Sequence, residues 1–254
     1  MRRFDAVLVV DWSAASTPKL GTDSIWSAWT TGDVPELVNH PTRRSFERWW
    51  HERLGAFAGR VLAGFDFSFG YPRGFAAAAG SVGDAPWSAT WLRLTAALTD
   101  DAANANDRFA VASSLNAAIG PGPGPFWGAP RSAVGVSLSA TKAPGFPHRG
   151  LTEFRVCEAE LRAAGRMVQS SWQLLGAGSV GSQVLTGIPV LERFRRTARR
   201  EVHVWPFTTG LALPALAADA VVLAEVWPSL VPIDGARHAV RDAAQVATLA
   251  VQLT

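Results

Sequence analysis

Four acidic residues stand beside apolar stretches of this chain. Asp11 ends the apolar run 6–10, Asp66 ends 61–65, and Glu225 ends 220–224. Asp242 opens an amphipathic stretch over 240–250. A carboxylate at the end of a buried strand is costly unless it is paired or binds a metal. The pattern therefore predicts one cation site, at which Asp11, Asp66, Glu225 and Asp242 are both metal ligands and catalytic residues.

The chemistry that such a site would support is hydrolysis of a phosphodiester. Carboxylate oxygens are the ligands that Mg²⁺ and Mn²⁺ prefer. Two such ions about 4 Å apart, bridged by acids, can activate water and stabilise the leaving group. The acids must first meet. If the strand that ends at Asp66 pairs beside the strand that ends at Asp11, the two become neighbours, and Glu225 and Asp242 can converge on them.

The elements that must position these acids follow from hydrophobic spacing. Apolar and alternating runs predict strands at 6–12, 24–30, 34–39, 61–66, 201–206 and 220–227, with a Gly32-Asp33 turn. Helical spacing predicts helices at 43–59, 86–100, 107–118, 151–165, from the glycine-rich turn after 173 to about 198, and 239–252. The first helix should bury Phe46, Trp49 or Trp50, Leu54 and Phe57, and the helix at 151–165 should bury Phe154, Cys157 and Leu161. The segment 121–128 is rich in Pro and Gly and predicts a loop.

This order predicts an α/β protein with a mixed five-stranded sheet. The length of 254 residues fits one large domain over 1–254. Residues 72–150 are rich in Ala, Gly and Pro, and we expect an insertion over the site there.

Composition narrows the classes of function. The chain has 24 Lys and Arg, of which only Lys19 and Lys142 are lysine, and a formal charge of +3. That balance is compatible with a phosphate or nucleic-acid partner without requiring one. The single cysteine, Cys157, excludes an internal disulfide and a cysteine-based zinc site, and predicts a reducing, cytoplasmic location. No apolar run reaches the ~18 residues of a membrane span, so we expect no membrane partner. The five histidines show no ligand spacing.

Seven segments carry a resemblance to a family of proteins. The chain resembles, nearly throughout and in order, an uncharacterised bacterial family that is regarded as having a ribonuclease H-like fold and is predicted to be a nuclease; the segments are 9–14, 63–72, 124–128, 155–158, 176–183, 224–229 and 241–246. The resemblance implies that Asp11 and Asp66 are the fold's metal-binding acids on strands 1 and 4. It assigns Glu225 and Asp242 to the later acidic positions.

A glycine-rich segment offers a different function. Gly176, Gly178 and Gly181 form G-x-G-x-x-G, and with Ser179 they predict a dinucleotide- or phosphate-binding turn if a strand at 171–175 precedes it. The same glycines could simply form a tight turn under Trp172. The segment is also a near match to a nucleophile elbow at Ser179, with Asp219 or Asp234 and His238 following in hydrolase order.

Two further features keep other classes open. Arg193, Arg195, Arg196, Arg199 and Arg200 cluster at a predicted helix end, where they could favour the helix dipole or contact phosphate. Trp87, Trp91 and Trp127 in the insertion fit an enclosed pocket for a small molecule or cofactor. The sequence thus leaves three hypotheses: a Mg²⁺- or Mn²⁺-dependent nuclease-like hydrolase, a small-molecule or cofactor-related binding protein, and a scaffold that keeps unused acids.

Overall fold

The chain folds into two compact units in this computed structural model. The structure describes residues 3–142, 145–176, 178–212 and 215–254. Unit 1 comprises residues 1–67, 101–105 and 194–254, and unit 2 comprises 68–100 and 106–193. The residues 72–150 that we expected as an insertion lie in unit 2, apart from 101–105. No helix among the described residues is long and apolar enough to cross a membrane.

Unit 1 is built on a mixed sheet of six strands, not the five expected. The strands are β1 (Ala6–Asp11), β2 (Ile25–Thr30), β3 (Glu36–His40), β4 (Val61–Phe65), β5 (Val202–Trp205) and β6 (Val221–Glu225), in the order β3-β2-β1-β4-β6-β5. The additional strand is β5, which pairs only with β6 and forms one edge. Every strand except β3 lies within a predicted run, and β3 extends one residue beyond the predicted 34–39. These runs combine β-branched and aromatic residues between turn signals.

The central pairing of the sheet, β1 with β4, is the one that is needed to make Asp11 and Asp66 neighbours. β1 and β4 are parallel neighbours, with Val10 opposite Phe65, and β6 lies parallel to β4 on its other side. β2 and β3 are antiparallel additions beyond β1. Parallel neighbours end at the same edge of a sheet, so the carboxyl ends of β1, β4 and β6 meet there.

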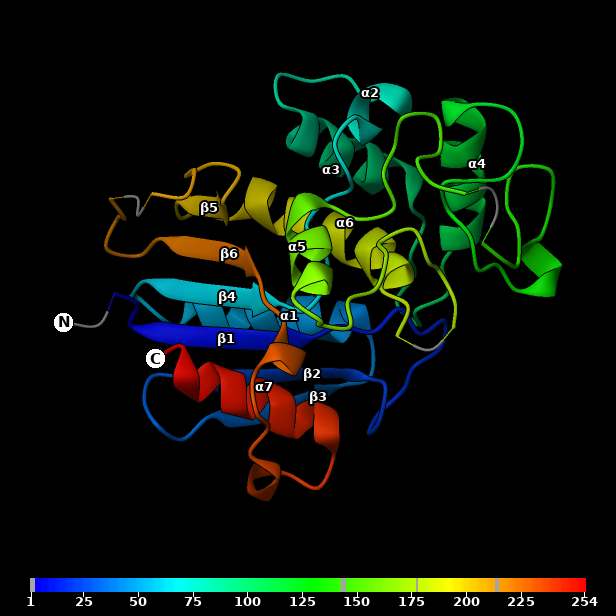
Figure 1. Cartoon of the computed structure of the whole chain (residues 1–254). Helices are drawn as coiled ribbons and strands as arrows, with labels where there is room; N and C mark the ends of the chain where they lie inside the picture. The colour runs from blue at the N-terminus through cyan, green and yellow to red at the C-terminus, as the bar shows by residue number, and fades with distance from the viewer. Residues whose placement is uncertain (1–2, 143–144, 177, 213–214) are drawn as a thin grey trace. The chain divides into compact units, whose positions relative to one another are not determined.

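Two helices cover opposite faces of this sheet (Figure 1). α7 (Arg241–Gln252) packs Ala243, Val246 and Leu249 against Val7 and Val9 of β1. On the other face, α1 (Arg43–Gly55) packs Phe46 and Trp50 against Phe65 of β4. Since successive strand residues face opposite sides, odd-numbered positions of β1 face α7 and even-numbered positions face α1.

α1 begins and ends at clear local signals. Thr42 caps it through a reciprocal bond pair with Ser45: the Thr42 hydroxyl accepts from the Ser45 amide at 3.1 Å, and the Ser45 hydroxyl accepts from the Thr42 amide at 3.1 Å. The helix ends at Gly55, four residues before the predicted end. Phe46, Trp50 and Leu54 are buried as expected.

Unit 2 is helical and loop-rich. It contains the helices α2 (Phe75–Ala78), α3 (Pro86–Ala97), α4 (Arg108–Ile119) and α5 (Val156–Ala163). It also contains α6 (Gly181–Thr197) as far as residue 193, and the rest of α6 belongs to unit 1. The Pro- and Gly-rich loop 121–128 is held by the buried Asn116 side chain, which donates to the Phe126 carbonyl at 2.9 Å and accepts from its amide at 2.9 Å. Tyr71, Phe75, Phe126 and Trp172 form an aromatic cluster beside that loop.

Candidate functional site

The structure brings two of the four predicted acids into direct contact. Asp11 is the last residue of β1, and Asp66 follows the last residue of the neighbouring β4. Both side chains lie on the face of the sheet that α7 covers, because alternate residues of a strand point to the same face. Asp11 therefore points to the same side as Val7 and Val9, and Asp66 to the same side as Leu62, and these three apolar residues pack with α7. Their carboxyl groups are joined by a hydrogen bond. Two carboxyl groups that are 55 residues apart in the sequence therefore lie at one point.

Burial and mutual repulsion hold protons on this pair. Loss of solvent raises the pKa of Asp11 well above its usual value, and the negative charge of Asp66 raises it further. Burial also raises the pKa of Asp66 to about 6, although the hydrogen bonds from Asp11 and from the Trp12 amide oppose this. The Trp12 amide donates to Asp66 Oδ1 at 2.8 Å. This bond fixes the orientation of the Asp66 carboxyl.

Asp242 is the third acid of the group. It lies in the first turn of α7, where its charge raises the pKa of both Asp11 and Asp66. Its Oδ2 accepts from the backbone amide of Asp23 at 2.9 Å. We call Asp11, Asp66 and Asp242 the acidic group. All three belong to unit 1.

Asp23 was not predicted as part of this site. It lies in the segment between β1 and β2, and its charge also raises the pKa of Asp11. Its backbone has φ 54°, which Asp tolerates better than most residues. Its carboxylate pairs with Lys19 at 3.2 Å, and its carbonyl accepts from the Ser13 hydroxyl at 3.0 Å. No sequence signal predicts this position, because the contact with Asp242 spans 219 residues.

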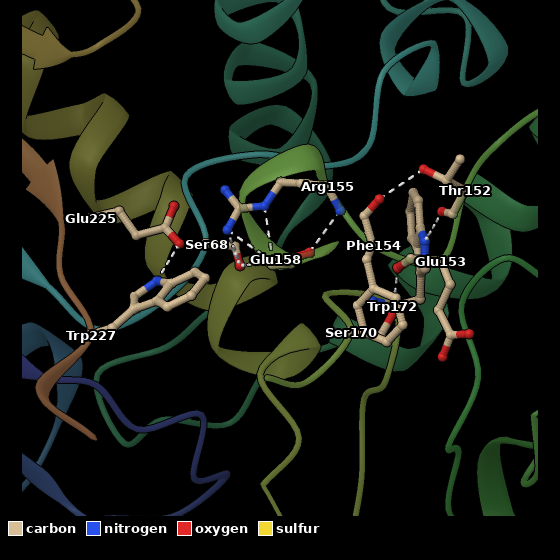
Figure 2. A network of polar contacts seen from close by, with 10 residues as sticks. All are labelled: Ser68, Thr152, Glu153, Phe154, Arg155, Glu158, Ser170, Trp172, Glu225 and Trp227. Carbon is tan, nitrogen blue, oxygen red and sulfur yellow. Dashed lines mark hydrogen bonds and ion pairs between the residues drawn. The ribbon is translucent and has the colours of Figure 1, made fainter. Parts of the chain in front are cut away.

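Glu225 lies on the other face of the sheet. It is paired in register with Phe65, whose ring packs on α1, whereas Asp66 is the next residue and faces α7. Val226, one residue after Glu225, packs with the α7 side. The Trp227 ring donates to Glu225 Oε1 at 2.7 Å (Figure 2). The structure thus gathers Asp11, Asp66 and Asp242 and leaves Glu225 out of the acidic group.

The acidic group has the donor chemistry for a hard cation. Among the described residues, neither Asp11 nor Asp66 forms an ion pair with a Lys or Arg side chain. No three His, Cys, Asp or Glu side chains of the described part of the chain are close enough to form a ready metal site. The geometry is therefore a contacting pair with a third acid nearby. Mg²⁺ is commonly held by one or two carboxylates together with water and substrate phosphate oxygens, which fits this pair.

The glycine-rich segment lacks the strand that a dinucleotide-binding turn follows. Residues 171–175 form no strand, and Gln173 makes only an isolated bridge to Trp127. Gly176 and Gly178 have φ 115° and 70°, Ser179 donates its amide to the Gly176 carbonyl at 3.1 Å, and Ala177 lies outside the described residues.

Gly181, the first residue of α6, has no room for a side chain. A Cβ there would lie 2.6 Å from the Gln173 carbonyl oxygen. This glycine therefore has a packing role in a tight turn. The same missing strand removes the context for a nucleophile elbow at Ser179. Among the expected partners, Asp234 pairs with Arg237, and His238 Nδ1 accepts from the Val240 amide.

α5 buries a different face from the one predicted. Cys157 is exposed, and Glu158 is the buried residue. Glu158 pairs with Arg155 at 2.9 Å and accepts from the Ser68 hydroxyl at 3.2 Å, and Arg155 also donates to Ser68 at 3.0 Å (Figure 2). The predicted burial of Cys157 was wrong because it ranked residues by hydropathy. An acid can be buried when an ion pair and hydrogen bonds satisfy its carboxylate, as they do for Glu158.

The tryptophans of unit 2 are used mainly for packing. Trp91 is fully buried and donates to the Phe69 carbonyl at 2.8 Å, and Trp87 packs edge-on against it. Trp127 pairs its backbone with Trp172 and Leu174. A groove of about 290 Å³ lies between α3 and α4, lined by Arg93, Ala96, Ala97, Val111, Ser114 and Leu115. The three tryptophans singled out in the sequence do not line it.

Comparison with other proteins adds no relative. No family model, no curated protein and no solved structure matches this chain.

Proposed function

We propose that unit 1 is a Mg²⁺- or Mn²⁺-dependent phosphodiester hydrolase that uses the acidic group. The observation that carries this proposal is the hydrogen-bonded pair of Asp11 and Asp66 at the carboxyl ends of two adjacent parallel strands. Ligands of α/β sheets bind outside these strand ends. The resemblance to the ribonuclease H-like family, which assigns metal-binding acids to strands 1 and 4, supports the same residues.

The polypeptide contributes charge and orientation to such a reaction. Asp11 and Asp66 would hold the ion, with Asp242 completing the negative field, and the ion would supply an activated water and stabilise the leaving oxygen. The Trp12 amide orients Asp66, and the Asp23 amide orients Asp242. Since the pair retains a proton near neutral pH, cation binding and proton release are coupled.

Titration with Mn²⁺ tests the site. Calorimetry at pH 7.5 is expected to show binding to the wild-type protein and none to Asp11→Asn. Asp33→Asn is the matched control, because Asp33 is an exposed acid in the turn between β2 and β3 of the same unit. Cleavage of labelled single-stranded and duplex oligonucleotides should require Mn²⁺ or Mg²⁺ and be lost with the same variant. Unchanged Mn²⁺ binding by Asp11→Asn would refute the assignment.

A further inference from the structure

Exposed cations gather on the outer side of unit 1, where α1 meets the end of α6. Phe194 of α6 stacks on Trp50 of α1 at 3.9 Å between ring centroids and also contacts the His51 ring at 5.5 Å. The Arg200 guanidinium donates to the Phe57 carbonyl just beyond α1. These contacts place the last turn of α6 beside the second half of α1. The exposed Arg and His residues of the two segments form what we call the α1–α6 basic surface: Arg44, Arg48, His51, Arg196 and Arg199.

On α1 the two arginines and the histidine of this surface follow one helical stripe. Arg44, Arg48 and His51 are spaced i, i+4 and i+7, so they lie above one another on the exposed side. Arg48 is about 6 Å along the helix axis from Arg44, and His51 is about 10 Å from it. The 3.4 Å rise per nucleotide of one duplex strand makes these separations equivalent to roughly two and three nucleotides. A phosphate backbone could therefore contact each turn of the stripe.

The arginines of this surface are mostly not engaged by acids. Arg44 pairs with Glu47 at 3.5 Å, and Glu52 is the other acid of α1. Among the described residues, no acidic side chain pairs with Arg48, Arg196 or Arg199. The helix dipole accounts for a cation in the last turn of α6, such as Arg196. It does not account for Arg48 in the middle of α1 or for Arg199 beyond the end of α6.

The stripe of basic side chains begins at the N-terminal end of α1, and this end binds the segment after Asp11. The buried Arg43 guanidinium donates to the carbonyls of Ser13 and Ala15 at 3.1 and 2.9 Å. Arg44 is the next residue and is 59% exposed. The first turn of α1 thus carries Arg44 of the basic surface and also binds the segment that follows Asp11.

We propose that the α1–α6 basic surface binds the phosphate backbone of nucleic acid. Arginine forks match phosphate oxygens in geometry and charge. Binding through phosphates is independent of base sequence and depends steeply on salt. This inference concerns the side of unit 1 that α1 covers and goes beyond the proposed function, and its test measures binding alone.

The test measures binding of a fluorescein-labelled 20-nucleotide single-stranded DNA, and of the same sequence as RNA, by anisotropy in EDTA across a series of NaCl concentrations. The triple variant Arg48→Ala/Arg196→Ala/Arg199→Ala is expected to bind about a hundredfold more weakly than wild type near 0.1 M salt. Its slope of log affinity against log salt should be shallower by about two. Circular dichroism should show that the variant is folded.

A charge-matched control separates a surface from net charge. Arg73→Ala/Arg131→Ala/Arg166→Ala removes three exposed arginines of unit 2 for which no ion pair is present among the described residues, and should change affinity less than twofold. Equal weakening by both variants, no binding by the wild type, or retention on anionic vesicles but not on oligonucleotides overturns the inference. Because EDTA removes the cation, binding without any cleavage in Mn²⁺ would overturn the proposed hydrolase and leave the basic surface standing.

Discussion

The carboxyl groups of Asp11 and Asp66 are hydrogen-bonded to each other across the neighbouring parallel strands β1 and β4. Two ionised carboxylates cannot form such a bond, so the contact requires a proton on one of them. The raised pKa of both groups supplies that condition near neutral pH. Protonation and cation binding are alternative ways to neutralise the pair, and each leads to a measurable effect.

The first prediction concerns stability against pH. The pKa of Asp66 is near 3.8 when unfolded and about 6 when folded, so the folded state holds more protons between these values and loses stability as pH rises through them. Asp66→Asn removes this dependence. In EDTA, the free energy of unfolding of Asp66→Asn minus that of wild type should be about 1–3 kcal/mol more positive at pH 7 than at pH 4. Urea unfolding at both pH values measures it. A difference that shrinks as pH rises would mean that a cationic group stabilises ionised Asp66.

The second prediction concerns metal and pH together. Because a cation must displace the shared proton, Mn²⁺ should raise the melting temperature of wild type at pH 7.5 and have little effect near pH 5. Thermal scans with and without Mn²⁺ at the two pH values test this. Asp66→Asn should show no Mn²⁺-dependent shift at either pH. A shift of equal size at both pH values in wild type would place the ion away from the pair.

The third prediction separates the two later acids. Asp242 acts electrostatically on the pair, whereas the register of β6 places Glu225 on the face covered by α1. Asp242→Asn should weaken Mn²⁺ binding about tenfold, a size typical of groups that support metal ligands. Glu225→Gln should change it less than twofold. Calorimetric titration of both variants decides the matter, and a larger loss for Glu225→Gln would reverse the assignment.

The acids at β1 and β4 were predictable, and the face of Glu225 was not. An acid that ends an apolar run marks the carboxyl end of a strand, and the adjacency of β1 and β4 then brings Asp11 and Asp66 together. The run before Glu225 is apolar at every position, because β6 is buried on both faces. Such a run has no alternation of apolar and polar residues from which the face of the sheet that each side chain takes can be deduced. Only the pairing of Glu225 with Phe65 reveals which face it takes.

Tertiary contacts explain the other differences. Asp23 approaches Asp242 only after α7 has packed on β1 and β2, and nothing in the neighbourhood of either residue predicts that contact. β5 was predicted as a strand, but a count of five strands left no place for it at the sheet edge. In α5, Glu158 is buried because Arg155 and Ser68, which both precede the helix, satisfy its carboxylate. Hydropathy alone does not detect a paired charge.

The fourth prediction concerns this buried ion pair in unit 2. Glu158 is 1% exposed and Arg155 13% exposed. Glu158→Gln removes the charge that pairs with the Arg155 guanidinium and should cost about 3–5 kcal/mol of stability. Ser68→Ala removes only a hydroxyl from the network and should cost about 1 kcal/mol. Chemical denaturation followed by circular dichroism compares them, with Glu160→Gln, an exposed acid of the same helix, as the neutral control. Similar costs for all three variants would show that the pair adds nothing to the stability of unit 2.

The fifth prediction concerns Arg43, which supports the segment after Asp11. Its buried guanidinium donates to three carbonyls, those of Ser13, Ala15 and Asn104. A lysine ammonium keeps the charge but cannot reproduce this planar fork. Arg43→Lys should therefore leave buried carbonyls unpaired, cost about 2–3 kcal/mol of stability and weaken Mn²⁺ binding, since the chain beyond Asp11 loses its anchor.

Arg44→Lys is the matched control for this substitution, because it makes the same chemical change one residue later at a position that is 59% exposed. It should alter stability by less than about 0.5 kcal/mol and leave Mn²⁺ binding unchanged. Urea unfolding and calorimetry on the two variants give both quantities. If Arg43→Lys behaves as Arg44→Lys does in both measurements, the segment after Asp11 is positioned by the sheet alone. If only stability falls, Arg43 holds the fold together but does not support the acidic group.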